Sequence, residues 1–318
     1  MSTVYQIIGG YVNNIIPFGI FVNRLDATNQ YHIPLCMAKQ LDLYDQTCLT
    51  ISRQVTKAYS TSFYTASKLF SPSIRQAIWS LYGFVRLADE IVDTFDHIDQ
   101  EAQLDKFTAD YEEAMRQGLS INPILHSFQQ TVKAYHIPED YIRAFLDSMR
   151  LDLHKKDYIN DEETAAYIYG SADVVGLMCL TIFCNGDKTL FDQLEEPARR
   201  LGSAFQKVNF LRDLKTDSLE LGRNYFSAVV GKTLDNKLKK QLEADIRSDF
   251  EAARQGLVQL PKGAKLAVKV AYEYYLTLLA AIERTDSEHL LNERIRVTNV
   301  RKSLILMRCY LSHQLKRN

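Results

Sequence analysis

Two acidic segments carry the side chains best suited to chemistry. The stretch LADEIVDTF holds Asp89 and Asp93, and the stretch LRDLKTD holds Asp213 and Asp217. Carboxylates four residues apart share one face of a helix and repel each other, and Asp is a poor residue for a helix interior. A bound cation would offset this repulsion, whereas a solvated surface would only tolerate it.

The four-residue spacing does not identify a site alone, because it also occurs at Asp157/Asp161 and at Asp245/Asp249. These two pairs lie in HKKDYINDEE and EADIRSDFEAAR, which are crowded with other charges. They lack a neighbouring stripe of amides, so we interpret both as solvated surface.

The first acidic segment belongs to a helix with a polar stripe beside an apolar one. Tyr82, Arg86, Asp89 and Asp93 follow at spacings of four, three and four, which places them on one helix face at the edge of the core. In the simpler interpretation, Arg86 is only the partner of Asp89. That interpretation leaves Asp93 unpaired.

The second acidic segment adds amides to carboxylates. Gln206, Asn209, Asp213 and Asp217 share a helix face, and their hard oxygen atoms suit Mg²⁺. Basic and aromatic residues follow closely, so the segment resembles a clamp for a metal and a diphosphate: Arg212, Lys215, Arg223 and Tyr225. The alternative is a charged helix end with pairs of the i,i+4 type.

Two further segments leave alternatives open. In YSTSFYTA, Ser60, Ser62 and Phe63 lie at a helix start, where hydroxyls bind phosphate or simply cap the helix. In YIYGSADVVGLM, Gly170 and Gly176 interrupt an apolar helix. They predict either room for a bulky ligand or tight packing between helices.

The composition of the chain excludes some classes of function and structure. With 38 basic and 39 acidic residues and a net charge of −1, the chain gives no electrostatic reason to bind nucleic acid. Five scattered cysteines without a CxxC pair predict reduced thiols and a cytoplasmic location. The most apolar run, residues 174–184, has eleven residues, fewer than the about 20 that span a bilayer, and is predicted to be a core helix.

The scarcity of Gly and Pro, together with helical periodicity, predicts an all-α chain. Residues 1–36 lack this periodicity and are predicted to be an extension outside the core, whereas 37–318 form one catalytic domain. A helix with Pro72 in its first turn contains the first acidic segment. The other predicted helices span residues 41–69, 100–117, 123–135, 138–153, 162–184, 189–215, 233–257, 264–284 and 296–315.

The motifs together resemble one family. YSTSFYTA, LYGFVRLADEIVD, YIYGSADVVGLM, FQKVNFLRDLKTD and LGRNYF occur in the order found in the squalene/phytoene synthases, the head-to-head isoprenoid synthases. With RIRVTNVRKSL they span residues 59–304. The residues of these motifs are most similar to those of phytoene synthases, including bacterial ones.

The resemblance implies an isoprenoid-synthase fold, a single helical domain around a central apolar cavity. It implies that Mg²⁺, or Mn²⁺ in its place, bridges two prenyl diphosphates to Asp89, Asp93, Asn209, Asp213 and Asp217. It also implies that Tyr82 and Tyr167 act with the aspartates in catalysis. The implied substrate-binding residues are Ser60, Ser62, Phe63, Arg86, Gln206, Asn209, Arg212, Arg223 and Tyr225.

The implied reaction joins two geranylgeranyl diphosphates head to head into phytoene, through the cyclopropyl prephytoene diphosphate, in carotenoid biosynthesis and without NADPH. One alternative is a farnesyl diphosphate enzyme that makes dehydrosqualene or squalene. The alternative from another class is an inactive helical scaffold. A large hydrocarbon product implies peripheral contact with a membrane, and the oligomeric state stays open.

One departure from the family pattern concerns the substrate. The third motif reads SAD where the family usually has VAG, which introduces Asp173. A buried carboxylate needs a partner or a proton. Asp173 is expected either to approach the cavity and change the fit of chain length, or to bond to a neighbouring helix.

Overall fold

The computed structural model describes residues 35–215, 223–226 and 234–315. Helices make up the regular structure of these residues, with no strand among them and one isolated bridge between Asp157 and Asn224. The all-α prediction is therefore confirmed. The chain divides into two units, 1–43 and 44–318. The predicted extension over 1–36 falls almost wholly outside the described residues and stays a prediction.

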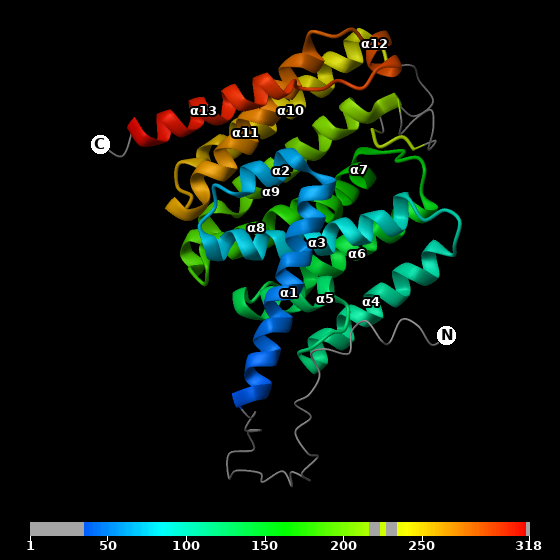
Figure 1. The fold of residues 1–318 in the computed structure, drawn as a ribbon. Helices are drawn as coiled ribbons and strands as arrows, with labels where there is room; N and C mark the ends of the chain where they lie inside the picture. The colour runs from blue at the N-terminus through cyan, green and yellow to red at the C-terminus, as the bar shows by residue number, and fades with distance from the viewer. Residues whose placement is uncertain (1–34, 216–222, 227–233, 316–318) are drawn as a thin grey trace, which may run out of the picture. The chain divides into compact units, whose positions relative to one another are not determined.

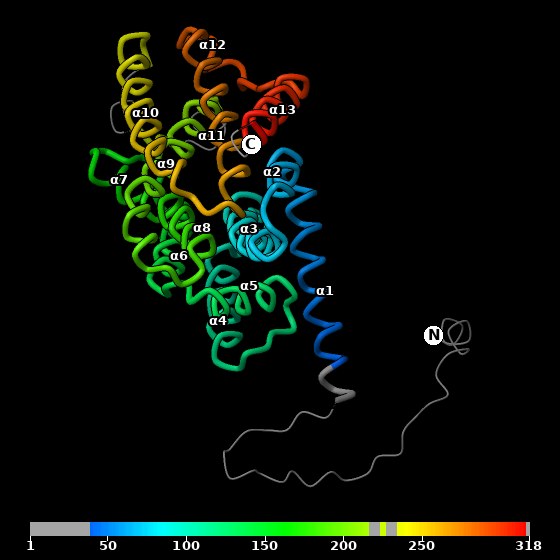
Figure 2. The backbone as a smooth tube through the Cα atoms, turned by 90° about the vertical axis from the view of Figure 1, so that its left-hand side faces the viewer, coloured from blue at the N-terminus to red at the C-terminus, as the bar shows by residue number. Residues whose placement is uncertain are grey.

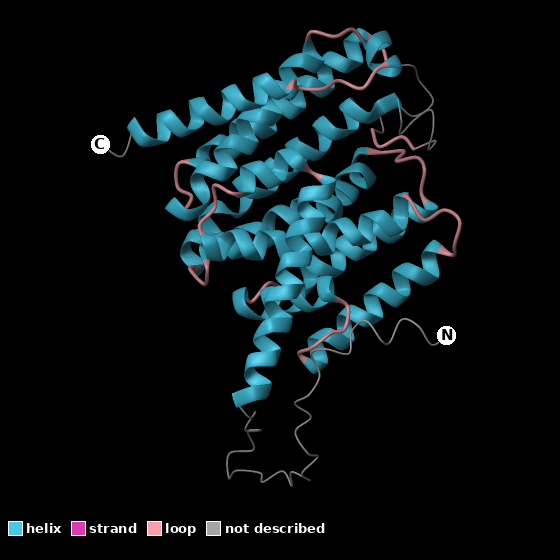
Figure 3. Cartoon of the chain, viewed as in Figure 1, coloured by secondary structure: helices cyan, strands magenta, loops and turns pink. Residues whose placement is uncertain are grey.

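The helices of Figure 1 follow one another without a sheet between them (Figure 3). In chain order they are α1 Leu35–Tyr59, α2 Thr61–Ser67, α3 Pro72–Asp93, α4 Gln100–Gln117, α5 Pro123–Tyr135, α6 Glu139–His154, α7 Asp161–Ile168, the π-helical segment η1 Tyr169–Asp173, α8 Val174–Cys184, α9 Lys188–Leu214, α10 Asn236–Leu257, α11 Lys262–Glu283, α12 Ser287–Asn292 and α13 Asn299–Leu315.

Helix α3 organises the first half of the core. It begins at Pro72, whose missing N–H costs nothing in a first turn. Its apolar stripe centres on Phe84, which is fully buried. The Phe84 ring stacks on Phe128 of α5 with centroids 4.0 Å apart, and on Phe107 of α4 at 5.3 Å. These contacts fix the helix that bears the first acidic segment.

Helix α9 organises the second half. Figures 1 and 2 show α10 and α11 beside it on one side and α8 on the other. Asp187 caps the helix by accepting a hydrogen bond from the Leu190 amide at 3.0 Å. Its buried residues include Ala204, Val208 and Leu211. Their spacing leaves the polar residues of the second acidic segment on a half-buried flank of α9.

The glycines of the third motif serve tight helix packing. A Cβ on Gly170 would lie 1.8 Å from Ser148 Oγ and 2.6 Å from the Ala144 carbonyl oxygen, both on α6. A Cβ on Gly176 would lie 3.1 Å from the Ala198 carbonyl oxygen on α9. Of the two alternatives open from the sequence, close approach of backbones is the one the structure shows.

The helical stretch Asp161–Cys184 has 24 residues and a mean hydropathy of 1.6, which is long and apolar enough to cross a membrane. Within the structure, 61% of its most apolar window is buried. Val174, Leu177 and Met178 pack inside the protein. The prediction of a core helix at residues 174–184 is confirmed.

Two details of the helix pattern differ from prediction. The single helix predicted for residues 41–69 breaks at Ser60, whose backbone leaves the helical region at φ −144° and ψ 89°. Helix α12 was not predicted, because its six residues are too few to show a period. The break at Ser60 separates α1 from α2 and so sets the position of the YSTSFYTA motif.

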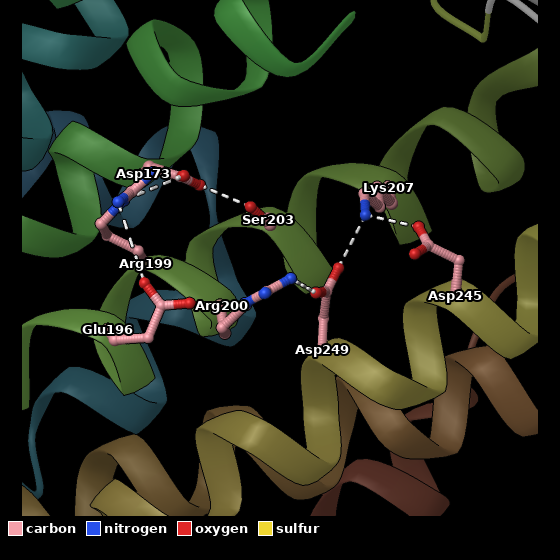
Figure 4. A network of polar contacts seen from close by, with 8 residues as sticks. All are labelled: Asp173, Glu196, Arg199, Arg200, Ser203, Lys207, Asp245 and Asp249. Carbon is pink, nitrogen blue, oxygen red and sulfur yellow. Dashed lines mark hydrogen bonds and ion pairs between the residues drawn. The ribbon is translucent and has the colours of Figure 1, made fainter. Parts of the chain in front are cut away.

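The prediction of solvated surface is wrong for Asp249. Its side chain is 0% exposed, and it accepts from Arg200 Nη1 at 2.8 Å and from Lys207 Nζ at 2.8 Å (Figure 4). Asp249 follows Ile246 by three residues on the buried face of α10, and the two cations come from α9. Asp245 is exposed, as predicted, and pairs with Lys207 at 2.5 Å.

Candidate functional site

The carboxylates of α3 form ion pairs with arginines. Arg86 Nη1 lies 2.5 Å from Asp89 Oδ2, and its Nη2 lies 2.5 Å from Glu90 Oε1. Arg223, from the segment after α9, donates from Nη1 to Asp93 Oδ1 at 2.8 Å. The simple pairing of Arg86 with Asp89 is thus present. Asp93 is also paired, through an arginine 130 residues away in sequence.

Burial and mutual repulsion perturb this pair of aspartates. Loss of solvent raises the pKa of Asp89 to about 6, and the nearby Asp93 carboxylate adds to the rise. Arg86 and Arg223 act in the opposite direction. A carboxylate with such a raised pKa, in contact with cations at the edge of a core, is a common mark of a functional site.

The second acidic segment has the same pattern of charges. Arg212 donates to both carboxylate oxygens of its neighbour Asp213, and Arg294 Nε lies 2.6 Å from Asp213 Oδ1. Asn209 Oδ1 accepts from Tyr275 OH at 3.3 Å, and Gln206 lies half-buried about one turn before it on α9. Asp217 lies outside the described residues, so its predicted role stays a prediction.

Aromatic residues lie beside both groups of charges. The Tyr82 ring stacks on Phe63 of α2, with centroids 5.0 Å apart. Burial raises the pKa of Tyr82, and Tyr275 of α11 is among the groups whose charge adds to the shift. Tyr275 stacks in turn on Phe205 of α9 at 3.9 Å. Tyr82 of the first acidic helix therefore contacts α2, while Tyr275 contacts α9, the helix of the second acidic segment.

The hydroxyls of the YSTSFYTA motif have different partners. Ser60 Oγ accepts from the Phe63 amide at 3.3 Å and caps α2. Ser62 Oγ accepts from Lys302 Nζ of α13 at 2.9 Å. Lys302 also lies over the Tyr274 ring, 5.5 Å from its centroid. Capping is therefore the observed role of Ser60, while Ser62 faces a cation.

A buried aspartate completes the site and was missed in the sequence. Tyr167 OH donates to Asp152 Oδ2 at 2.6 Å, and Arg223 Nη2 donates to the Asp152 carbonyl oxygen at 3.2 Å. Asp152 Oδ1 is buried without a hydrogen-bond partner. The signal that could have found it is the apolar stripe of α6, where Asp152 follows Met149 by three residues on the buried face.

Four aromatic rings pack beside Asp152. Tyr225 stacks on Phe210 with centroids 4.3 Å apart, on Tyr167 at 5.0 Å and on Tyr158 at 5.6 Å. All four rings are buried. They form a rigid, water-poor wall next to the arginine that pairs with Asp93.

The carboxyl group of Asp152 predicts a pH dependence of stability. Burial raises its pKa to about 7 from an ordinary value of 3.8. Between these values the native state keeps a proton that the unfolded chain has lost, so stability falls as the pH rises. Asp152→Asn should remove this dependence and stabilise the protein at pH 8 by up to roughly 4 kcal/mol, with no gain near pH 4.

Urea unfolding at pH 4, 6 and 8 would measure this effect. Asp147→Asn is the matched control, because Asp147 is an exposed aspartate of the same helix. Parallel pH profiles for Asp152→Asn and the wild type would contradict the assignment of a raised pKa to Asp152.

Asp173 bonds to a neighbouring helix. Its Oδ1 accepts from Ser203 Oγ at 2.7 Å, and its Oδ2 lies 3.6 Å from Arg199 Nε, both on α9 (Figure 4). The side chain is buried, and burial raises its pKa to about 6. Of the two roles that the sequence left open, contact with a neighbouring helix is the one observed.

No group of three or more His, Cys, Asp or Glu side chains in the described ranges gathers closely enough to hold a metal ion. The described carboxylates of the two acidic segments are Asp89, Asp93 and Asp213, each paired with an arginine. Hard oxygen atoms of this kind suit Mg²⁺ shared with substrate phosphates, which needs few protein ligands.

Comparison with known sequences identifies relatives over most of the chain. Residues 56–301 match the family described as squalene/phytoene synthase. The chain is 29% identical to phytoene synthase 2, chloroplastic, of Solanum lycopersicum, over 81% of this chain and 88% of that protein. It is 28% identical to a phytoene synthase of Arthrospira platensis, over 80% and 90% of the two chains. The match to phytoene synthase 1, chloroplastic, of Arabidopsis thaliana, 29% identical, covers 83% of this chain and 66% of that protein.

Solved structures share the fold. A dehydrosqualene synthase in complex with a ligand superposes with a TM-score of 0.73 at 19% identity, over 86% of this chain and 98% of that one. A squalene synthase from Alicyclobacillus acidocaldarius superposes with a TM-score of 0.66 at 21% identity, over 76% and 95%. The predicted isoprenoid-synthase fold is confirmed.

Proposed function

The chain belongs to the squalene/phytoene synthase family, and from that premise we propose that this prenyltransferase-type enzyme joins two geranylgeranyl diphosphates head to head into phytoene, in carotenoid biosynthesis. The observation that carries the proposal is that the carboxylates of the two acidic segments each contact an arginine. Asp89 and Asp93 contact Arg86 and Arg223, and Asp213 contacts Arg212 and Arg294.

Such an arrangement suits a diphosphate with its metal. Guanidinium groups bind phosphate oxygens in a fork, and the carboxylates they now contact are the groups that would turn to Mg²⁺. In the proposal, Asp89, Asp93, Asn209, Asp213 and Asp217 hold the metal. Bound there, Mg²⁺ would neutralise charge that develops on the departing diphosphate, and Mn²⁺ could replace it.

The residues of the chain do the remaining work. Arg86, Arg212 and Arg223 hold the diphosphates while the first carbon–oxygen bond breaks and leaves an allylic cation. The double bond of the second substrate attacks this cation, a proton leaves, and a cyclopropane closes to give prephytoene diphosphate. Loss of the second diphosphate and rearrangement give the 1–1′ bond, and loss of a last proton gives phytoene.

Cations of this kind need protection from water. The buried wall of Tyr158, Tyr167, Phe210 and Tyr225 excludes water from one side. The Tyr167 hydroxyl donates a hydrogen bond to Asp152, which fixes the orientation of the hydroxyl. In the proposal Tyr167 and Tyr82 lie beside the reacting carbons, and Ser62, Phe63 and Gln206 complete the binding region of the substrate.

The first test is product analysis of the purified enzyme with Mg²⁺. Geranylgeranyl and farnesyl diphosphate are supplied in parallel, each with and without NADPH. We expect phytoene from the longer substrate, without a requirement for NADPH. If only farnesyl diphosphate gave a product, a thirty-carbon hydrocarbon, the proposed type of reaction would stand and the proposed substrate would be wrong.

The same assay separates catalysis from a scaffold. Absence of hydrocarbon from either substrate, with protein that remains folded, would favour an inactive helical assembly protein. The retained aspartates and arginines of α3 and α9 argue for activity, because a scaffold has no need of repelling carboxylates. A cytoplasmic enzyme with peripheral membrane contact fits this proposal.

A further inference from the structure

The C-terminal helix α13 presents an apolar stripe to solvent. Six of the sixteen large apolar side chains that are exposed among the described residues lie on this one helix, so the exposure is concentrated rather than scattered. The spacing of four, three, four and four places five of them on one face, with Tyr310 at its edge. They are Val300, Leu304, Met307, Leu311 and Leu315, which are 53–78% exposed; we call them the α13 stripe.

The opposite face of α13 is already occupied. Cys309 is buried, and Ile305 and Leu306 pack with it against Leu266 and Val270 of α11. Lys302 anchors the same face through Ser62 of α2. Figure 2 shows α11 and α2 beside α13. Helix α13 is thus fixed to the protein by one face, and the α13 stripe lies on the other face.

The charge of this region is one-sided. From residue 294 to the end, the chain has seven arginines and lysines and no aspartate or glutamate, although its overall net charge is −1. Arg301 and Arg308 are exposed and, seven residues apart, flank the α13 stripe along one edge. A polar face rich in Lys and Arg beside an apolar face is typical of helices that lie in the plane of a membrane interface.

We propose that the α13 stripe docks on the surface of an anionic lipid bilayer. The apolar side chains enter the boundary between headgroups and acyl chains, and Arg301 and Arg308 contact anionic headgroups. An antiparallel second copy of this chain fits less well, because stacking two identical stripes in that way would bring their arginines together. An acidic phospholipid surface complements both features of the helix.

The inference rests on the shape and charge of α13 and is independent of the proposed reaction. It adds a location to the expected peripheral contact. Lys302, on the inner side of the helix, touches Ser62 of the predicted substrate-binding region. The docked face and that region therefore belong to connected elements, which suits substrates and products with long hydrocarbon chains.

Vesicle flotation of the full chain tests the proposal directly. The probes are vesicles of phosphatidylcholine alone and vesicles with about one-third phosphatidylglycerol, at low and high salt. We expect binding to the anionic vesicles that weakens as salt increases. Leu304→Ser/Leu311→Ser and Arg301→Gln/Arg308→Gln should each weaken it by roughly tenfold or more.

Matched controls distinguish binding through the α13 stripe from nonspecific binding of vesicles by other exposed residues. Ile121→Ser/Val258→Ser removes two exposed apolar residues from other parts of the chain, and Arg116→Gln removes an exposed arginine of α4. Neither should change vesicle binding. Equal binding by all variants, or no binding by the wild type, would overturn the proposal.

Light scattering after gel filtration gives an independent outcome. A dimer that dissociates in the Leu304→Ser/Leu311→Ser variant would replace the bilayer by a second copy of the chain. We expect both the wild type and the Leu304→Ser/Leu311→Ser variant to be monomers, and only the variant to lose vesicle binding. Thermal unfolding confirms that each substituted protein is folded.

Discussion

Asp89→Asn is expected to lower the rate of hydrocarbon formation by roughly two to three orders of magnitude. Asparagine keeps the shape of the side chain but removes the negative charge that metal binding needs. Arg86 keeps its second partner, Glu90, at 2.5 Å, so the arginine stays in place. The loss should therefore reflect the missing carboxylate and should show in kcat and in a higher requirement for Mg²⁺.

The stability of this variant should not fall. Burial raises the pKa of Asp89 to about 6, which means that the ionised carboxylate is unfavourable in the folded protein at pH 7. Asp245→Asn is the matched control, since Asp245 belongs to a DxxxD pair and is exposed on α10. Full activity of Asp89→Asn at low Mg²⁺ would contradict a role of this carboxylate in metal binding.

Gly170→Ala is expected to destabilise the protein by about 2–4 kcal/mol. The new methyl group would lie 1.8 Å from Ser148 Oγ and 2.6 Å from the Ala144 carbonyl oxygen. The hydroxyl could rotate away, but the carbonyl belongs to the backbone of α6, so the two helices must separate. Tight interiors tolerate such separation poorly. Urea unfolding measures the change.

Removal of one contact should recover part of the loss. In Gly170→Ala/Ser148→Ala the hydroxyl is gone, while the contact with the Ala144 carbonyl remains. We expect a stability between those of Gly170→Ala and Ser148→Ala. Wild-type stability for Gly170→Ala alone would show that α6 and η1 have more room than the structure gives them.

Periodicity predicted the helices that position the site, because the spacing of apolar residues in a long amphipathic segment shows which face packs in the core. The helices at residues 100–117 and 123–135 have the predicted bounds. The helical pattern of residues 41–69 does not show the break at Ser60, but the hydroxyls of YSTSFYTA indicate a helix start there, and Ser60 caps α2.

Site residues within one helix were predictable, whereas partners across helices were not. The spacing of Arg86, Asp89 and Asp93 on α3 was read from the sequence, and their proximity is observed. The pairing of Asp93 with Arg223 and that of Asp213 with Arg294 depend on tertiary contacts. No local pattern encodes a contact 130 residues apart.

Charged residues on buried faces were the main source of error. The charges around Asp249 in sequence favour a surface position, but α9 supplies two cations that offset the cost of burying its carboxylate. Asp152 also lies beside charged residues in sequence, in LDLHKK, and is buried. In both helices the aspartate continues an apolar stripe, which is the observation that distinguishes a buried carboxylate from a solvated one.

The stoichiometry of the wild-type reaction tests head-to-head condensation directly. Purified enzyme, geranylgeranyl diphosphate and Mg²⁺ are incubated together, and released diphosphate and hydrocarbon are both counted. We expect two diphosphates released for each phytoene formed, and neither product when the metal is removed by a chelator. Diphosphate release that yields only prenyl alcohol, or release that persists without metal, would contradict head-to-head condensation at this site.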